Sequence, residues 1–542
     1  MIPTPPPSAF HNRRDFVRMF SAGTVVAAAN RLMPNFLTHA AEAPDHGPAV
    51  SGLSFPEVGV SREDRLMIPV GFEMEVLLRW QDVIGPQDLK FGDHNDFMAF
   101  ILEESDTGWL WVNHENSSTV ANERDRHPED EALEARILAD VGGSCLRLKR
   151  DATTGRWRPV KPSPENFRMN GLDTMIPLVG PAAGSRWVGG EKHVIGSVAN
   201  CSGGISPWGT FFSGEENYQD FYGEPTTREK GCIRSAKYTR PPEHYGWLVE
   251  IDPRTREIFK HTSLGRFSHE NVAFAITKDG RLAAYMGDDK QGEHIYKFLS
   301  SGKFDPAAGT ANRRLLLDGV LHAADTKAGK WIPLHPDKNE TLKAAGWDLA
   351  KICTQTRQAA RAAGATPQSR PEDVEIHPET GEVFVALTAY TASDGDGAIT
   401  GAVLSIREKD GDAGASEFDS SLYLSTGLDN GLVWQDNLTL APGGALLVTT
   451  DYKMHSTPLP GSAQEKFGNN QLFVALTDGP ERGKVRRFAV APCGAEFCSP
   501  TLSPDGSELW VNVQHPGEAI PSKWPDGGTP KSALVAIRRK QA

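Results

Sequence analysis

The sequence predicts an all-β fold, namely a six-bladed β-propeller with loop and helix insertions. Two observations lead to this fold class. The 542 residues include 53 glycines and 38 prolines, and runs with helical periodicity are few, which is typical of many short strands joined by turns. In addition, one short unit recurs six times along the chain, at intervals of roughly 60 to 100 residues.

Each unit begins with a turn signal, continues as an apolar strand and closes on polar residues. The six units end at Asn113-His114-Glu115, Gly214-Glu215-Glu216, Gly287-Asp288-Asp289, Thr388, Asp451 and Gln514-His515. Repeats of this kind indicate a propeller, and we expect these strands to be the innermost ones, so that their ends form a ring around the channel. The alternative is a pair of β-sandwiches whose turn acids are solvated.

The first 43 residues are expected to lie outside the fold. Arg13 and Arg14 precede a mildly apolar run and small residues at Ala41 and Ala43, which is typical of a twin-arginine (Tat) signal peptide. The run is too short to span a membrane stably. We therefore predict export by the Tat machinery to the periplasm or the medium; the alternative is a disordered basic N-terminus. Residues 44–542 are predicted to form one propeller domain, with an alanine-rich insertion around 306–365.

Charge and cysteine content limit the function classes. The formal net charge is −13, which argues against nucleic acid as a partner because phosphate backbones require basic patches. None of the six cysteines forms a C-x-x-C pair, so a zinc finger or thioredoxin-like site is not expected. Cys493 and Cys498 are close enough to form a small disulfide loop, with two buried thiols as the alternative. No coiled-coil heptads occur, and we expect a monomer.

Three adjacent acid pairs carry the first chemical signal: Glu215-Glu216, Asp288-Asp289 and Glu372-Asp373. Neighbours in a strand point to opposite faces, so one acid of each pair can face the channel. Converging carboxylates repel one another and would be protonated or bind hard cations such as Ca²⁺ or ferric iron. Solvated loop charges are the alternative for any single acid.

Cys201 and Arg370 carry the second signal. Cys201 precedes paired glycines in a tight turn, where a thiolate could hold a metal ion. Because calcium does not select sulfur, Cys201 indicates a second ion, a transition metal; buried packing is the alternative. Arg370 precedes Pro371-Glu372-Asp373, and its planar fork suits phosphate oxygens, with a structural salt bridge as the alternative. A Gly-rich phosphate loop and a G-x-S-x-G elbow are both missing from the sequence, which weakens the case for nucleotide-driven or serine-hydrolase chemistry.

At this point the motifs resemble those of a known family, the PhoX-type alkaline phosphatases. They run in order along the chain from about Asn113 to Glu518, and the cysteine-containing block is the most specific. The motifs are Asn200-Cys201-Ser202-Gly203-Gly204, Ser213-Gly214-Glu215-Glu216-Asn217, Ser268-His269-Glu270, Gly287-Asp288-Asp289, Arg370-Pro371-Glu372-Asp373, Asp436-Asn437-Leu438 and Gln514-His515-Pro516-Gly517.

The resemblance implies a six-bladed propeller with irregular blades and a cluster of two iron ions (Fe³⁺) and several Ca²⁺ ions. It implies Cys201, Glu216 and Glu270 as iron ligands, and Arg370 with Glu372 at the phosphate. The calcium ligands that it implies are Glu115, Asp288, Asp289, Asp373 and Asp436, with the choice between Asp288 and Asp289 open.

The predicted function is therefore that of an exported, metal-dependent alkaline phosphatase that hydrolyses phosphate monoesters. In the implied reaction, metals neutralise the phosphoryl oxygens and Arg370 clamps one more. One alternative is a calcium-dependent propeller lactonase with His114, His269 or His515 as the base; Cys201 argues against it, because a lactonase needs no thiolate. The other is a non-catalytic exported propeller that binds a partner through its rim.

Overall fold

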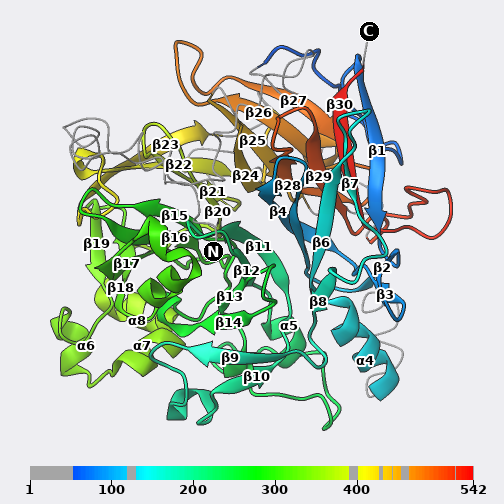
Figure 1. Ribbon diagram of the computed structural model, residues 1–542. Coiled ribbons are helices and arrows are strands. Elements are labelled where there is room, and N and C mark those ends of the chain that lie inside the picture. Colours follow the sequence, from blue (N-terminus) through cyan, green and yellow to red (C-terminus); the bar gives the residue numbers. More distant parts are fainter. Residues whose placement is uncertain are drawn as a thin grey trace, which may run out of the picture.

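The structure is a computed structural model that describes residues 53–118, 130–389, 401–425, 431–441, 444–452, 463–518 and 520–540. Six β-sheets surround a common axis (Figure 1). The first strand of each sheet contacts the first strand of the next, and these contacts close a ring. The arrangement confirms the predicted six-bladed propeller.

The blades, numbered along the chain, have four to six strands each. Blade 1 contains β4 (Asn95–Glu104), β5 (Thr107–His114), β6 (Gly142–Arg150), β7 (Trp157–Pro159) and β8 (Phe167–Met169). Blade 2 contains β11 (Asn200–Ile205), β12 (Phe211–Glu215), β13 (Leu248–Ile251), β14 (Ile258–His261), β9 (Met175–Val179) and β10 (His193–Ile195). Blade 3 contains β15 (Ala273–Ile276), β16 (Arg281–Gly287), β17 (Ile295–Lys303), β18 (Gly319–Asp325) and β19 (Lys330–Pro333).

The other three blades have four strands each. Blade 4 contains β20 (Pro371–Ile376), β21 (Val383–Leu387), β22 (Ala402–Glu408) and β23 (Phe418–Ser425). Blade 5 contains β24 (Gln435–Ala441), β25 (Ala445–Thr450), β26 (Gln471–Leu476) and β27 (Val485–Val490). Blade 6 contains β28 (Glu496–Leu502), β29 (Leu509–Gln514), β30 (Ala533–Arg539) and β1 (Phe72–Arg79). A separate ribbon is formed by β2 (Val83–Gly85) and β3 (Leu89–Lys90).

Helices lie in the connections between strands. The α-helices are α4 (Glu131–Asp140), α5 (Gln219–Tyr222), α6 (Glu340–Ala344), α7 (Leu349–Thr354), α8 (Thr356–Ala363) and α9 (Ala463–Phe467). The 3₁₀ helices are η1 (Arg186–Val188), η2 (Pro242–His244), η3 (Thr262–Leu264), η4 (Pro306–Leu316) and η5 (Lys409–Gly411). The predicted insertion at 306–365 thus holds η4 and α6 to α8, together with β18 and β19 of blade 3.

The hydrophobic core is divided into layers between neighbouring blades. Trp111 of blade 1 packs with Phe211 of blade 2, and Val385 of blade 4 packs in one cluster with Tyr285 of blade 3. Corresponding clusters fill the other four interfaces between blades. Because both faces of an inner blade strand are covered, these strands are apolar almost throughout, for example Ala445–Thr450, which is buried at every position. The apolar runs of the recurring units therefore reflect burial on both faces.

The structure corrects one part of the repeat interpretation. The recurring units form the second strand of each blade (β5, β12, β16, β21, β25 and β29), and the innermost strands are β4, β11, β15, β20, β24 and β28. Because the two strands run antiparallel, the end of the second strand lies beside the start of the first. Both strands therefore bring polar residues to the same mouth of the channel.

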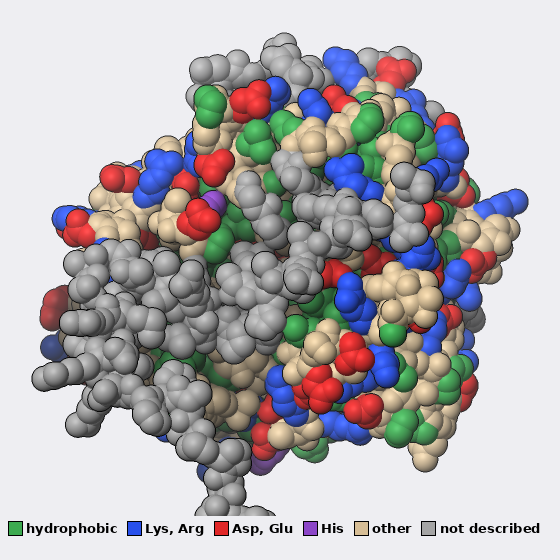
Figure 2. All heavy atoms as spheres, turned by 45° about the horizontal axis from the view of Figure 1, so that its top comes forward, with side chains coloured by type: hydrophobic (Ala, Val, Ile, Leu, Met, Phe, Trp, Pro, Cys, Tyr) green, Lys and Arg blue, Asp and Glu red, His purple; other side chains and the backbone are tan. Residues whose placement is uncertain are grey.

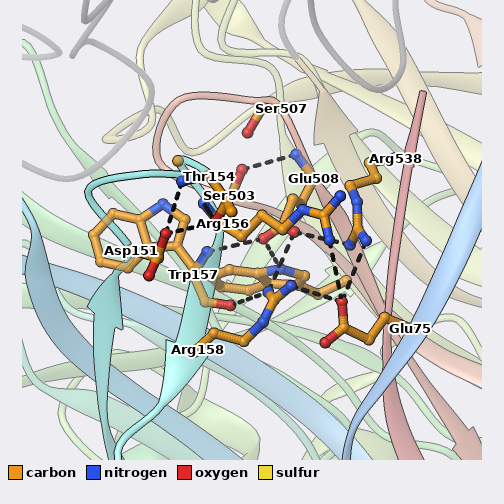
Figure 3. Close-up of polar contacts among 12 residues, drawn as sticks. Glu75, Asp151, Thr154, Arg156, Trp157, Arg158, Ser503, Ser507, Glu508 and Arg538 are labelled. Carbon is orange, nitrogen blue, oxygen red and sulfur yellow. Dashed lines mark hydrogen bonds and ion pairs between the residues drawn. The ribbon is translucent and has the colours of Figure 1, made fainter. Parts of the chain in front are cut away.

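The ring closes where the first strand completes the last blade. In Figure 1, β1 lies beside β30, and the two pair antiparallel along their length. Figure 3 shows the polar contacts at this seam. Glu75 of β1 accepts from Arg158 of β7 at 2.6 Å and from Arg538 of β30 at 3.2 Å. Glu508 accepts from Arg538 at 3.4 Å. The seam thus joins blade 6 to blade 1 by paired charges.

The outer surface shows no preference for one charge sign on the face drawn in Figure 2, where acidic and basic side chains of the described residues are interspersed. None of the described helices is long and apolar enough to cross a bilayer. The predicted signal peptide lies outside the described residues, and the domain limits stay a prediction.

Candidate metal centre

A repeated backbone device aims side chains into the channel mouth. In four blades a non-glycine residue with positive φ stands two positions before a residue with a ligand-type side chain. The pairs are His94 (φ 44°) and Asp96, Ala199 (53°) and Cys201, Arg370 (51°) and Glu372, and Trp434 (49°) and Asp436. Positive φ is costly for such residues, and such strained positions often cluster at functional sites. In blade 6, Gly494 (φ 66°) stands two positions before Glu496.

The strand register breaks at the same places. In these four blades, the pairing of the first two strands shifts between Asn95 and Met98, Asn200 and Gly203, Pro371 and Val374, and Gln435 and Leu438. Such bulges bend the strand and re-aim side chains. The residue that follows each first pair is Asp96, Cys201, Glu372 or Asp436. Local backbone irregularity therefore turns equivalent positions toward a common centre.

Three groups of side chains there could hold metal ions. The first is Cys201, Glu216 and Glu270; the second is Glu270, Glu372 and Asp436; the third is Asp96, Glu496 and Cys498. Within each group the ligand atoms lie within 4.8 Å of one another. The Cys201 thiol joins the first group to the third, because it donates to Asp96 Oδ2 at 3.3 Å and to Glu270 Oε1 at 3.4 Å. We refer to these eight residues as the metal centre.

The metal centre contains six buried acids and few basic side chains that could balance their charge. In the described part of the chain, the ion pairs that reach these acids are Arg370 to Glu372 at 2.7 Å and His515 to Glu496 at 3.0 Å. Buried oxygen atoms of Asp96, Glu216, Glu270 and Glu496 have no hydrogen-bond partner within the protein. Buried polar atoms are normally satisfied, so these oxygens and two thiols form a donor set that fits bound cations.

Electrostatics support this interpretation. Burial, and then the carboxylate of Asp289, raises the pKa of Glu216 well above its ordinary value. Burial, and then Glu372, does the same to the pKa of Glu270 and of Asp436. Burial, and then Asp96 and Glu270, raises the pKa of the Cys201 thiol. A bound cation favours the charged form of each group and would reverse these shifts.

Arg370 lies at the edge of the metal centre. Its Nε and Nη2 donate to the two oxygens of Asp289 at 2.8 and 2.7 Å, and Nη2 also reaches Glu372. Burial alone would raise the pKa of Asp289, but the charge of Arg370 lowers it overall. The Arg370 side chain is 29% exposed, against 5% for Asp289 and 4% for Glu372. It is thus the accessible member of this trio and can donate to an anion from outside.

Four predicted ligands lie outside the three groups. Glu115 accepts from Gln514 Nε2 at 2.7 Å. Asp289 is held by Arg370, and Asp288 by Arg357. Asp373 accepts from the backbone N–H groups of Leu438 and Val374. Of the predicted ligands, the groups include Cys201, Glu216, Glu270, Glu372 and Asp436.

Sequence reasoning missed Asp96, Glu496 and Cys498. It followed the ends of the second strands, whereas these residues lie on the innermost strands β4 and β28. Cys498 entered only as a disulfide candidate. Cys498 and Cys493 do not form a disulfide: the Cys498 thiol donates to Gln514 Oε1, and the Cys493 thiol to the carbonyl of Arg62. A cysteine two residues after Glu496 was the available signal.

The three candidate bases of the lactonase alternative have other partners. His114 binds Asp93 O and Ser144 Oγ through its two ring nitrogens. His269 Nε2 lies 2.8 Å from Gly265 O. His515 binds Gly494 O and Glu496 Oε1. Only His515 touches the metal centre, and it does so as a partner of one carboxylate.

Comparisons with known proteins give the family. The family model described as alkaline phosphatase PhoX matches residues 53–517. The chain is similar to the solved structure of Pseudomonas fluorescens PhoX in complex with vanadate, a transition state analogue, with 30% identity, a TM-score of 0.80, and coverage of 90% of this chain and 98% of that one.

Two other solved structures show much weaker likeness. A protein of unknown function from Dyadobacter fermentans has 10% identity and a TM-score of 0.40, with 87% of this chain and 100% of that chain covered. A gluconolactonase from Xanthomonas campestris has 9% identity and a TM-score of 0.36, with 91% and 98% covered. The search of curated proteins returned no match.

These findings support a phosphatase over the lactonase and non-catalytic alternatives. PhoX phosphatases depend on metals, which agrees with the donor set at the channel mouth. The match extends over most of the chain and includes every residue of the metal centre. This chain belongs to the alkaline phosphatase PhoX family.

Proposed function

We propose that the chain is an exported phosphatase that hydrolyses phosphate monoesters at the metal centre, with Fe³⁺ and Ca²⁺ as its ions. The observation that carries the proposal is the excess of buried, unpaired acids around two thiols. Thiolate and carboxylate together suit iron, whereas the acid-only group suits calcium. We assign Cys201, Glu216 and Glu270 to iron, and Glu372 and Asp436 to calcium. Asp96, Glu496 and Cys498 form a second thiol-containing group, which we assign to a further ion.

Bound cations would supply Lewis acidity, which neutralises the phosphoryl charge and acidifies a water molecule. The chain itself must bind and orient the substrate. The partly exposed guanidinium of Arg370 donates to a phosphoryl oxygen, and Asp289 holds its plane through two hydrogen bonds. Glu372 belongs to the metal centre and also pairs with Arg370. It therefore couples the orientation of the Arg370 guanidinium to that of the metal ligands.

The test compares three substrates on the purified protein: p-nitrophenyl phosphate, bis-p-nitrophenyl phosphate and a γ-lactone. We expect hydrolysis of the monoester to dominate, to disappear when the metals are stripped by a chelator, and to return on adding Ca²⁺. Elemental analysis should find both iron and calcium. Retained monoesterase activity in metal-free protein would refute the proposal.

The proposal extends to export and assembly. The twin arginines, the folded state that a preassembled metal centre requires, and the exported nature of PhoX phosphatases support Tat transport to the periplasm or medium. Replacing both Arg13 and Arg14 with Lys should leave the enzyme in the cytoplasm; unchanged export would contradict the Tat route. We expect the exported protein to be a monomer, which its elution volume in size-exclusion chromatography would check.

A further inference from the structure

Asp288 is a buried acid next to the metal centre, and both of its carboxylate oxygens bind one arginine. Arg357 of helix α8 donates to both of its oxygens: Nε to Oδ2 at 2.9 Å and Nη2 to Oδ1 at 2.5 Å. The backbone N–H of Ser268 also donates to Oδ1 at 3.3 Å. The Asp288 side chain is 0% exposed, and that of Arg357 is 11% exposed. Asp288 thus has a bidentate cation partner, unlike the acids of the metal centre.

The pair lies where two ligand-bearing segments cross. Ser268 precedes Glu270 by two residues, and Arg357 Nη2 also donates to Ser268 Oγ at 2.9 Å. His269 and Asp288 form an antiparallel bridge, and the N–H of Asp289 donates to Ser268 O at 3.1 Å. One guanidinium therefore fixes both backbones: the one that carries Glu270 and the one that carries Asp289.

Asp289 passes this restraint to the anion site, because it is the acid that orients Arg370. A shift of Asp288 would move Asp289 by way of the shared peptide, and with it the plane of the Arg370 fork. Geometry errors of about 1 Å in a positioning group can cost roughly 100-fold in rate. The Arg357–Asp288 pair therefore acts on the reacting atoms only indirectly, through Asp289 and Arg370.

The arginine comes from a rigid part of the inserted segment. Thr356, its neighbour, accepts from the backbone N–H of Arg266 at 3.0 Å and donates to Cys353 O at 2.8 Å. Ala359 and Ala360 of the same helix are buried in the hydrophobic cluster between blades 2 and 3. Helix α8 is therefore anchored to the propeller, and it presents Arg357 at a fixed place.

We propose that Arg357 is a positioning residue of the phosphatase, and that Asp288 is its partner and not a metal ligand. Through this pair, helix α8 sets the relative positions of Glu270 and Asp289 and hence the orientation of Arg370. A cation at Asp288 would have to displace a guanidinium that already satisfies both oxygens. The proposal resolves the choice between Asp288 and Asp289: Asp289 faces the reaction, and Asp288 supports it.

The experiment uses the metal-loaded enzyme and the variants Arg357→Gln, Arg357→Lys and Asp288→Asn, with Arg407→Gln as the matched control. Arg407 lies in β22 of blade 4 and pairs with the buried Glu382, which keeps Arg482 as a second partner. The readouts are kcat and KM for p-nitrophenyl phosphate, the inhibition constant of inorganic phosphate, and iron and calcium per chain. The proposal rests on the phosphatase function, which the wild-type enzyme must show first; a silent wild type would refute that function and not this pair.

We expect Arg357→Gln and Asp288→Asn each to lower kcat by about 10- to 100-fold, the range found for groups that orient metal ligands, and to weaken phosphate inhibition. Metal content stays at the wild-type value, the double variant is no worse than either single one, and Arg357→Lys recovers part of the loss. Arg407→Gln behaves as wild type. If Arg357→Gln fails to fold, the proposal is tested by kcat and phosphate inhibition in Arg357→Lys and Asp288→Asn.

Two results would overturn the proposal. Wild-type kinetics and phosphate inhibition in Arg357→Gln, or in Arg357→Lys where the former does not fold, would make the pair merely structural. Loss of one metal ion per chain in Asp288→Asn, with full metal content in the Arg357 variants, would make Asp288 a ligand.

Discussion

Two clusters of acids in this propeller differ in how their charge is balanced. At the seam between blades 6 and 1, Glu75 and Glu508 are shared by Arg158 and Arg538, with distances between 2.6 and 3.5 Å. At the metal centre, six acids and two thiols meet Arg370 and His515, and four acids keep oxygen atoms without a partner in the protein.

The comparison shows that burial alone does not identify a functional acid. The Glu508 side chain is 2% exposed and that of Glu372 is 4% exposed. Glu508 is nevertheless surrounded by arginines, whereas Glu372 lies among other acids. A carboxylate with arginine partners joins strands, and its charge is already compensated. A carboxylate among other carboxylates needs a cation from outside or a proton.

The largest expected effect comes from Cys201→Ser. Serine keeps the size but not the soft, easily deprotonated sulfur, so the iron that we assign to Cys201, Glu216 and Glu270 should be lost. Activity should fall at least 100-fold, since even outer-shell partners of metal ligands cost 10- to 100-fold. The wild-type protein should be coloured by thiolate-to-iron charge transfer and the variant colourless, with unchanged circular dichroism. An active Cys201→Ser variant with a full iron content would contradict the assignment.

Arg370→Lys should give the second-largest loss of activity. Lysine keeps the charge but cannot form the planar double contact with Asp289. Losing a charged hydrogen bond of about 2–3 kcal/mol corresponds to roughly 30- to 150-fold in kcat/KM. The thermal midpoint should stay near the wild-type value, and Arg482→Lys, in the outer part of blade 5, serves as a control. Unchanged kinetics would make Arg370 a structural ion-pair partner, equivalent to the arginines of the seam.

Glu508→Gln should lower stability and leave activity unchanged, the opposite of what we expect at the metal centre. It removes a buried charge from the seam and leaves Arg538 with Glu73 and Glu75, so stability should fall by about 2–3 kcal/mol, somewhat less than for a pair left wholly uncompensated. Activity below the unfolding temperature and metal content should not change. The measurement is the thermal midpoint with kcat at 25 °C; a loss of bound metal would show that the two clusters are not independent.

Sequence reasoning predicted the propeller because its strands are short, apolar and periodic, and these properties depend on local composition. It predicted Cys201, Glu216 and Glu270 through family resemblance. It assigned the units to the wrong strand of each blade, because the second strand ends in polar residues at the same mouth where the first strand begins with polar residues.

The points that the sequence left open have a common cause. In our proposal, Arg357 decides whether Asp288 or Asp289 faces the centre; it lies 69 residues from Asp288 in the chain, and no local pattern reveals that partner. Asp96 and Glu496 reach the centre because positive-φ residues and register shifts turn them inward. A spacing rule for regular strands cannot predict such irregular backbone.

The central claim is that the metal centre needs cations to be stable, and its most direct test is thermal stability against pH before and after metal removal. Carboxyls with a raised pKa in the folded state stabilise it fully below their unfolded value, and this contribution is lost as pH rises through the folded value. In the metal centre, burial raises the pKa of Glu216, Glu270 and Asp436 well above the ordinary values of 4.5, 4.5 and 3.8, so the loss begins above these values. We predict that metal-free protein loses stability as pH rises from 5 to 8, whereas the metal-loaded protein does not. Superimposable curves would contradict the account.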